Sequence, residues 1–135
     1  MLDLYSRRVV SWAFSNQPNS ELSVRAINLA VQLRQPKQSV LFHTDQGVQY
    51  ASEAFKQALA QHNITASMSR RGNCLDNVVT ERFFRSLKSE RVNYRQYKTR
   101  AEGMADIAEY IESFYNQKRR HSTLGNISTV EYEAR

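Results

Sequence analysis

The sequence contains one cysteine, Cys74, and no apolar run long enough to cross a membrane. A single cysteine excludes an internal disulfide framework and is typical of proteins from a reducing cytoplasm. A membrane-spanning helix needs about 18 or more consecutive apolar residues, so the sequence predicts no transmembrane segment. The first residues also lack the apolar core of a cleavable signal peptide, because Asp3, Arg7 and Arg8 interrupt them.

Internal repeats, low-complexity tracts and linkers are also absent from the sequence. What is present is a chain of 135 residues, of which 41% are apolar and 24% are charged. These are the proportions of an ordinary globular protein, and the length suffices for one domain with a hydrophobic core. We therefore expect a cytoplasmic domain that does not interact with a membrane.

The net charge of +6 is concentrated in one segment of the chain. Residues 66–100 carry nine lysines and arginines against three acidic residues, whereas residues 1–65 have a net charge of +2 and residues 101–135 of −2. A basic segment of this kind predicts a polyanionic partner, with nucleic acid as the first candidate. The alternative is a solvated basic helix face without a partner. Glu81 lies within the segment, and a carboxylate in a basic field favours the nucleic-acid interpretation.

Alternating strands and helices predict an α/β fold with a mixed sheet flanked by helices. A hairpin of residues 1–5 and 9–14 is expected at the start, because β-branched and aromatic residues surround a turn sequence. Further strands are expected at residues 39–43 and 64–68, the first of them buried. Asp3 could be a metal ligand by residue type, but its place at a strand end favours a role in the turn.

Four helices are expected, at residues 21–34, 52–62, 76–91 and 99–116. Three of them follow side chains that can cap a helix: Asn19, Ser52 and Thr99. The apolar stripe expected to face the core is, in the first helix, Leu22, Ala26, Leu29, Ala30 and Leu33; in the second, Phe55, Ala58 and Leu59; in the third, Val79, Phe83 and Leu87; and in the fourth, Met104, Ile107, Ala108, Ile111 and Tyr115.

Asp45 and Glu81 are the candidate catalytic residues and metal ligands. Asp45 ends a predicted strand, Glu81 lies on the predicted helix 76–91, and 35 residues separate them. At about 100° per residue, Lys88 falls on the same side of that helix as Glu81. Phosphodiester chemistry favours two divalent ions, and Mg²⁺ takes oxygen ligands. A pair of acidic residues at one spacing is weak by itself, but this context indicates a metal-dependent phosphoryl-transfer site.

Other side chains are expected to support this site. Positions next to the metal ligands, supporting them without binding the ion, are expected for His43, Gln46, Gly47, Asn73 and Asp76. His43 is also explained as a hydrogen-bonded strand histidine, and Asn73, Asp76 and Asn77 as helix caps. Contacts to DNA phosphates are expected from Arg70, Arg71, Asn77, Arg82, Arg85, Lys88 and Arg91. Tyr94, Tyr97 and Tyr115 are candidates for stacking on bases, with a place in the core or at its rim as the alternative. Cys74 is explained as a small near-surface residue.

Several segments resemble bacterial insertion-sequence transposases with a retroviral-integrase-type catalytic core, in the C-terminal part of the second-reading-frame product. They are residues 3–12, 43–50, 69–84, 87–90 and 115–122. The resemblance covers essentially the whole chain. It implies a ribonuclease-H-like fold and an Asp-Asp-Glu site that uses Mg²⁺ or Mn²⁺ to cleave and join DNA at transposon ends. Asp45 matches the second catalytic Asp, Glu81 the catalytic Glu, and Lys88 a basic residue that contacts DNA.

The resemblance also implies a departure from the family pattern. The first catalytic Asp of the family lies on the central first strand, upstream of the hairpin, and Asp3 does not match it. We expect an integrase core over residues 1–122 that lacks this strand, followed by a C-terminal tail, 123–135. Two carboxylates hold a metal pair poorly, so we expect these residues alone to be nearly inactive and to self-associate through exposed strand edges.

Two other functions stay open at this point. One is a non-catalytic DNA-binding or oligomerising fragment that interferes with full-length transposase. The other is a decayed reading frame with no function. Replacing Asp45 by Asn separates an enzyme from a binding module, because it abolishes strand transfer and leaves salt-sensitive DNA binding intact.

Overall fold

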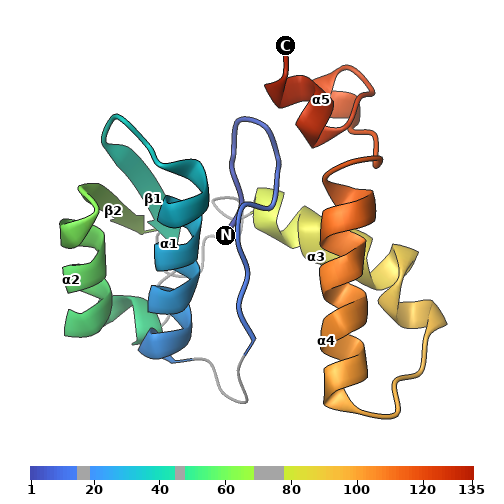
Figure 1. Cartoon of the computed structure of the whole chain (residues 1–135), viewed down its shortest axis with the longest axis horizontal. Coiled ribbons are helices and arrows are strands. Elements are labelled where there is room, and N and C mark those ends of the chain that lie inside the picture. The colour runs from blue at the N-terminus through green and yellow to red at the C-terminus, as the bar shows by residue number, and fades with distance from the viewer. Residues whose placement is uncertain (15–18, 45–47, 69–77) are drawn as a thin grey trace. The chain divides into compact units, whose positions relative to one another are not determined.

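A computed structural model describes residues 1–14, 19–44, 48–68 and 78–135. These residues form two compact units. The first unit contains Met1 and Val10–Val78, and the second contains Leu2–Val9 and Val79–Arg135. Figure 1 shows the helices and strands of each unit along the chain. No helix in the described ranges is both long enough and apolar enough to span a membrane.

The first unit is a small parallel sheet with two helices. Strands β1 (Val40–Thr44) and β2 (Ile64–Met68) pair in parallel, with Val40 opposite Ile64. Helices α1 (Ser20–Arg34) and α2 (Glu53–Gln61) pack on each other beside the sheet (Figure 1). The buried centre of this unit consists of Ile27, Phe55 and Leu59, against which Phe42 of β1 and Ile64 of β2 pack. The predicted strands and the inward face of α2 are therefore confirmed.

The start of each helix in this unit is set by a capping side chain. The Asn19 side chain accepts a hydrogen bond from the Leu22 N–H, and the Ser52 Oγ accepts one from the Phe55 N–H. Such bonds satisfy backbone donors that have no partner inside the helix. Both predicted caps are confirmed.

The predicted inward stripe of α1 is wrong in part. Ile27 and Ala30 are the buried residues of this helix, whereas Leu29 is 38% and Leu33 62% exposed. The sequence offered two apolar stripes on α1, and the contact with Phe55 and Leu59 of α2 selects the one that contains Ile27.

The prediction of a buried first strand is also corrected. In β1, Val40 is 39% and Leu41 68% exposed, and only Thr44 at its end is buried. β1 pairs with β2 along one edge, and no other described strand pairs with it. An apolar run therefore marks this strand correctly but does not reveal which of its side chains are covered.

The second unit begins with a short hairpin turn. Leu2 and Val9 form a single bridge, so the hairpin strands are shorter than expected. The Asp3 carboxylate accepts hydrogen bonds from the N–H groups of Tyr5 and Ser6, at 2.8 and 3.2 Å. This arrangement confirms the turn role of Asp3 over metal ligation.

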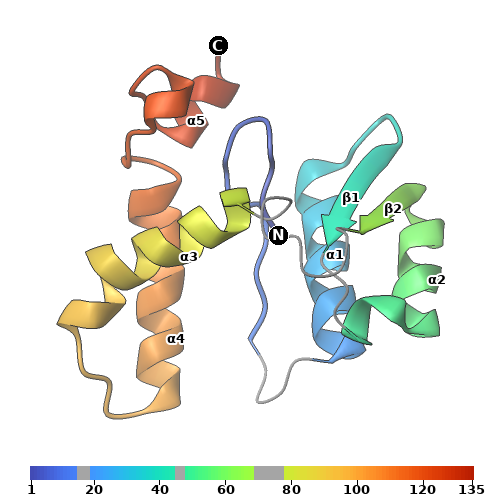
Figure 2. The same ribbon diagram turned by 180° about the vertical axis from the view of Figure 1, so that it is seen from behind.

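Helices form the rest of the second unit. They are α3 (Val78–Glu90), α4 (Arg100–Glu109), a π-helical segment (Tyr110–Tyr115) that continues α4, and α5 (Thr129–Glu133). α3 crosses the α4 helix, as both views show (Figures 1 and 2). Phe83 and Leu87 are buried, and the Phe83 ring lies 5.0 Å from that of Tyr115. The predicted inward face of α3 and the Thr99 cap of α4 are confirmed; residues 76–77 of the predicted helix lie outside the described residues.

Asn116 joins three parts of this unit. Its side chain accepts a hydrogen bond from the Val9 N–H and donates one to the Val9 carbonyl, both at 3.0 Å. Its own carbonyl accepts hydrogen bonds from the Thr129 hydroxyl and the Val130 N–H. Residues 123–135, which the sequence analysis set apart as a tail, therefore pack in the same unit as α3 and α4.

Candidate catalytic and nucleic-acid-binding site

Glu81 lies in the first turn of α3, with its side chain exposed. It forms no ion pair or hydrogen bond with any described residue. Lys88, in the last turn of α3, is exposed on the same side of the helix. Phe84, which lies between them, is 50% exposed. Among the described residues, the face of α3 that carries Glu81 and Lys88 is therefore largely exposed, whereas the opposite face carries the buried Phe83 and Leu87.

The second candidate carboxylate cannot be placed beside the first. Outside the described residues lie Asp45, Gln46, Gly47, Arg70, Arg71, Asn73, Cys74, Asp76 and Asn77. What the structure does show is the strand that leads to Asp45. β1 ends at the buried Thr44, one residue before it.

His43 has a hydrogen-bonded place in the sheet. Its Nδ1 lies 3.1 Å from the Ser67 Oγ, and the two residues are register partners across β1 and β2. Its Nε2 is buried and has no hydrogen-bond partner among the described residues. The bond to Ser67 agrees with the interpretation of His43 as a strand histidine.

A protein metal site needs several ligand side chains close to one another. Within residues 1–14, 19–44, 48–68 and 78–135, no three His, Cys, Asp or Glu side chains form a group that could hold a metal ion. Glu81 offers an exposed carboxylate with no partner among the described residues, which suits one oxygen ligand of Mg²⁺, although Glu21 and Glu112 are exposed and unpaired in the same way. The described residues therefore fit one ligand of such a site.

The predicted DNA-contacting residues of α3 divide into two groups. Arg82 and Arg85 are exposed and form no ion pair with a described residue. Arg91, in contrast, is held inside the unit. Its Nη1 lies 2.9 Å from Asp106 and 2.6 Å from Glu109, and its guanidinium stacks over the Tyr110 ring. Arg91 thus ties the end of α3 to α4, and its guanidinium already has partners within the unit.

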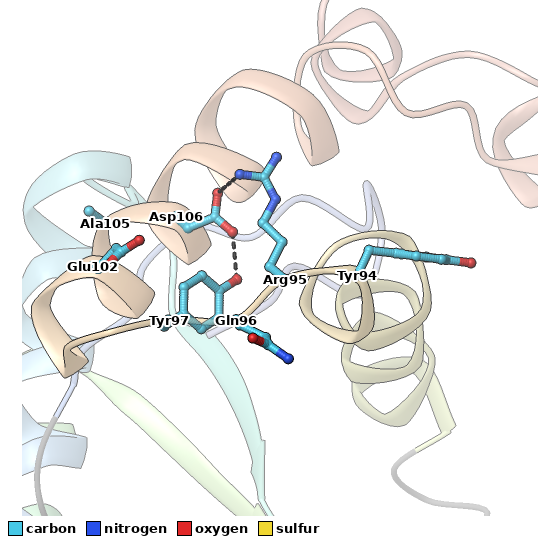
Figure 3. A pocket seen from close by; sticks show the side chains of 7 residues that line it. All are labelled: Tyr94, Arg95, Gln96, Tyr97, Glu102, Ala105 and Asp106. Carbon is cyan, nitrogen blue, oxygen red and sulfur yellow. Dashed lines mark hydrogen bonds and ion pairs between the residues drawn. The ribbon is translucent and has the colours of Figure 1, made fainter.

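Asp106 lines a polar pocket, here called the Asp106 pocket, together with residues 94–97 of the segment that connects α3 to α4 (Figure 3). Its carboxylate accepts a hydrogen bond from the Tyr97 hydroxyl at 2.5 Å and pairs with Arg95 at 3.4 Å. Burial disfavours the Asp106 charge, but the bonds from Tyr97 and Arg91 outweigh it and hold the pKa of Asp106 below its ordinary value. The bond to Asp106 also raises the pKa of Tyr97. These charges are matched within the protein.

The three candidate stacking tyrosines have different places. Tyr115 is buried against Phe83 and His121, and Tyr97 is tied to Asp106, so both belong to the packing of the unit. Tyr94 is 81% exposed and points away from Asp106 (Figure 3). Only Tyr94 presents a free ring face.

With this geometry established, comparisons with known proteins identify the family. The sequence matches the integrase core domain over residues 1–74, and a second integrase core domain description over residues 62–128. The chain belongs to the integrase core domain family.

The curated relatives of this integrase core are bacterial. It is 38% identical to the transposase for insertion sequence element IS904 of Lactococcus lactis and 38% identical to the transposase InsF for insertion sequence IS3A of Escherichia coli. Each match covers 98% of this chain, but only 52% and 46% of those relatives. The chain therefore spans about half the length of the curated relatives it matches.

Solved structures show the same fold at low sequence identity. The catalytic core domain of BIV integrase superposes with a TM-score of 0.60 at 20% identity, covering 87% of this chain and 72% of that one. A chain of the simian T-cell lymphotropic virus intasome in complex with the PP2A regulatory subunit B56 gamma superposes with a TM-score of 0.70 at 14% identity, over 90% of this chain and 42% of that one. The integrase core therefore has the ribonuclease-H-like catalytic fold.

Sequence analysis missed the internal roles of the polar segment 115–122. Arg119 Nε lies 2.7 Å from Oε1 and 2.8 Å from Oε2 of Glu90, and His121 is buried against Tyr115. Asn116 holds the Val9 backbone. The available signal was the density of polar residues straight after an apolar helix face, and it is not specific enough to assign these partners.

Proposed function

We propose that this chain is part of the catalytic core of an enzyme of DNA transposition, which cleaves DNA strands at transposon ends and joins them to target DNA. The observation that carries the proposal is the Glu81 carboxylate, exposed and unpaired among the described residues, with Lys88 on the same face of α3 in a chain of the integrase core family. An unpaired carboxylate on the same helix face as a cation two turns away suits a metal-dependent reaction on a phosphodiester.

Each candidate residue has a defined role in this proposal. Asp45 and Glu81 would hold a divalent ion, Mg²⁺ or Mn²⁺, as integrase cores typically use divalent metals. The chemistry supplied by a bound ion would be activation of the attacking oxygen and stabilisation of the leaving one. Lys88, Arg82 and Arg85 would contact DNA phosphates, together with Arg70, Arg71 and Asn77. Arg91 is left out because Asp106 and Glu109 occupy its guanidinium.

The 135 residues alone are proposed to be inactive or nearly so. Within them, resemblance to the family assigns only Asp45 and Glu81 as catalytic carboxylates, and two ligands bind a metal pair poorly. The active form would therefore be the longer protein that contains this chain, acting on DNA as a homo-oligomer.

The test is transposition by the complete natural reading frame that contains these residues, with single substitutions in it. Asp45→Asn and Glu81→Gln should each abolish strand transfer, while DNA binding persists. The matched control is Glu112→Gln, because Glu112 is also an exposed helical glutamate but lies on the π-helical segment. Strand transfer by Glu81→Gln at the level of Glu112→Gln would refute the catalytic role and leave a DNA-binding module.

A further inference from the structure

The second unit contains a small cleft whose lining is strongly basic. It has a volume of about 230 Å³ and lies between α3, the hairpin turn and the segment that follows the π-helix. We name it the arginine cleft and define it by Arg7, Arg82, Arg85, Ser86, Arg119 and His121. None of its lining residues is acidic. Hydroxyl groups of the 122–123 turn complete it.

Three of the four arginines have no charge partner in the described parts of the chain. Arg7, Arg82 and Arg85 form no ion pair or side-chain hydrogen bond with a described residue. Arg119 is paired with Glu90, and its guanidinium also lies over the Tyr115 ring, so its position is fixed. The cleft thus keeps an excess of three positive charges. In the Asp106 pocket, by contrast, the cation Arg95 is matched by acidic residues of α4.

A second observation points to an absent ligand. The His121 side chain is only 9% exposed, and its Nε2 is buried without a hydrogen-bond partner among the described residues. A buried polar atom without a partner is uncommon in folded proteins and costs free energy. Burial and the charge of Arg119 lower the pKa of His121, so its ring is neutral near pH 7. A neutral ring protonated at Nε2 can donate a hydrogen bond to an oxygen acceptor.

The chemistry of the cleft selects its ligand. Guanidinium groups, hydroxyls and an imidazole supply hydrogen-bond donors, and the forked geometry of arginine matches phosphate oxygens. The volume is below the roughly 300 Å³ at which pockets for drug-sized molecules begin, so one tetrahedral anion suits it better than a larger organic ligand.

The cleft does not coincide with the carboxylate face of α3. Arg82 and Ser86 are four residues apart on one face, roughly a third of a turn around the helix from Glu81 and Lys88. Arg85 lies between the two faces. A DNA strand that enters the cleft would therefore run beside Glu81, and the cleft would fix its position without taking part in the reaction.

We propose that the arginine cleft binds one phosphate group of a DNA backbone and so positions the strand relative to α3. This inference rests on the proposed function, because it takes DNA as the partner. It adds Arg7, Arg119 and His121, which come from outside the basic segment, to the DNA-contacting surface.

The test compares two double variants of the 135-residue chain with equal charge loss. Arg7→Gln with Arg82→Gln removes two unpaired guanidinium groups from the cleft. Lys37→Gln with Lys118→Gln removes two exposed charges that do not line it. Arg119 is avoided because its loss would also free Glu90. Binding of a short fluorescent duplex is measured by anisotropy at several salt concentrations, and inorganic phosphate is titrated while backbone amide signals are followed by NMR.

The cleft variant should bind the duplex about tenfold more weakly, with a salt slope smaller by about one, because one phosphate contact is lost. Inorganic phosphate should shift the amides of Ser86, Ser122 and Thr123 in the wild-type chain and not in the cleft variant. Equal duplex binding by the two double variants would overturn the cleft and leave DNA binding standing. Phosphate shifts without a change in duplex binding would assign the cleft to a free anion and overturn the DNA contact.

Failure of the wild-type chain to bind duplex DNA has a different meaning. It would refute DNA as the partner of this chain, and the cleft proposal would fall with it. If the wild-type chain and the Lys37→Gln, Lys118→Gln variant bind duplex DNA, only the cleft proposal can fail. If neither binds, DNA is not the partner of this chain.

Discussion

At the scale of single residues, His121 makes stability depend on pH in a predictable direction. Burial and the charges of Arg119 and Arg7 lower its pKa from 6.5, against the opposing charge of Glu90. As the pH falls below 6.5, the unfolded chain takes up a proton that the folded chain resists. The stability that neutral His121 supports is therefore complete above this value and is lost as the pH falls toward its folded pKa.

The measurement is urea denaturation at about pH 7.5 and about pH 5.5, roughly one unit to either side of the reference pKa of histidine. The wild-type chain should lose more stability between these conditions than the His121→Gln variant. All other titrating groups are shared by the two proteins and cancel in the comparison. An equal loss in both would show that His121 does not resist protonation in the folded state.

At the scale of elements, substitutions of Arg91 and Arg85 should have opposite effects: one should lower stability and the other should weaken DNA binding. Both are arginines of the α3 region, but Arg91 pairs with Asp106 and Glu109 while Arg85 is exposed. Arg91→Gln should lower the free energy of unfolding by about 1–3 kcal/mol, because its pair with Asp106 is largely buried and that with Glu109 is half exposed. Arg85→Gln should leave stability within about 0.5 kcal/mol and weaken DNA binding instead.

Denaturant titration and anisotropy on the same two proteins check this crossed pattern. DNA affinity is compared only under conditions where both are folded. A stable Arg91→Gln chain that has lost DNA affinity would restore Arg91 as a DNA contact and refute its packing role.

The elements also show why the sequence predicted helix starts better than helix faces. Asn19, Ser52 and Thr99 cap helices through bonds to N–H groups three residues away, so a short stretch of sequence contains all the information. The buried face of α1 depends on Phe55 and Leu59, which are distant in the sequence. The helix caps could therefore be predicted from the local sequence, whereas the exposure of Leu29 and Leu33 was decided by tertiary contacts.

In the candidate site, too, features set by local spacing were predicted and features set by distant residues were not. Glu81 and Lys88 were placed on one face of α3 by helical spacing alone, and the structure agrees. The π-helical segment was not predicted. The hydrogen bonds between the Asn116 side chain and the Val9 backbone were not predicted either, because Val9 is 107 residues away in the sequence. The internal pairing of Arg91 was not predicted for the same reason. Its charge is visible in the sequence, but the acidic partners on α4 that occupy it are not.

At the scale of the whole molecule, the 135-residue chain should self-associate through β1. Among the described strands β1 has only β2 as a neighbour, and its Leu41 side chain is 68% exposed. An unprotected strand edge beside exposed apolar side chains is a template for pairing with a second copy. A lysine on the edge opposes such pairing, so Leu41→Lys should shift the chain toward monomer without lowering its melting temperature. Sedimentation velocity at several protein concentrations measures the shift.

Leu33→Lys on α1 is the matched control, because Leu33 is also an exposed leucine, at 62%, but belongs to a helix. Association that survives Leu41→Lys and disappears in Leu33→Lys would move the contact from the strand to the helix. A wild-type chain that is monomeric at every concentration would refute self-association altogether. A strand edge and an apolar helix face need different kinds of partner surface, so this comparison also shows which kind of surface covers the exposed leucine. A strand edge requires another strand, whereas an apolar helix face requires only a complementary apolar surface.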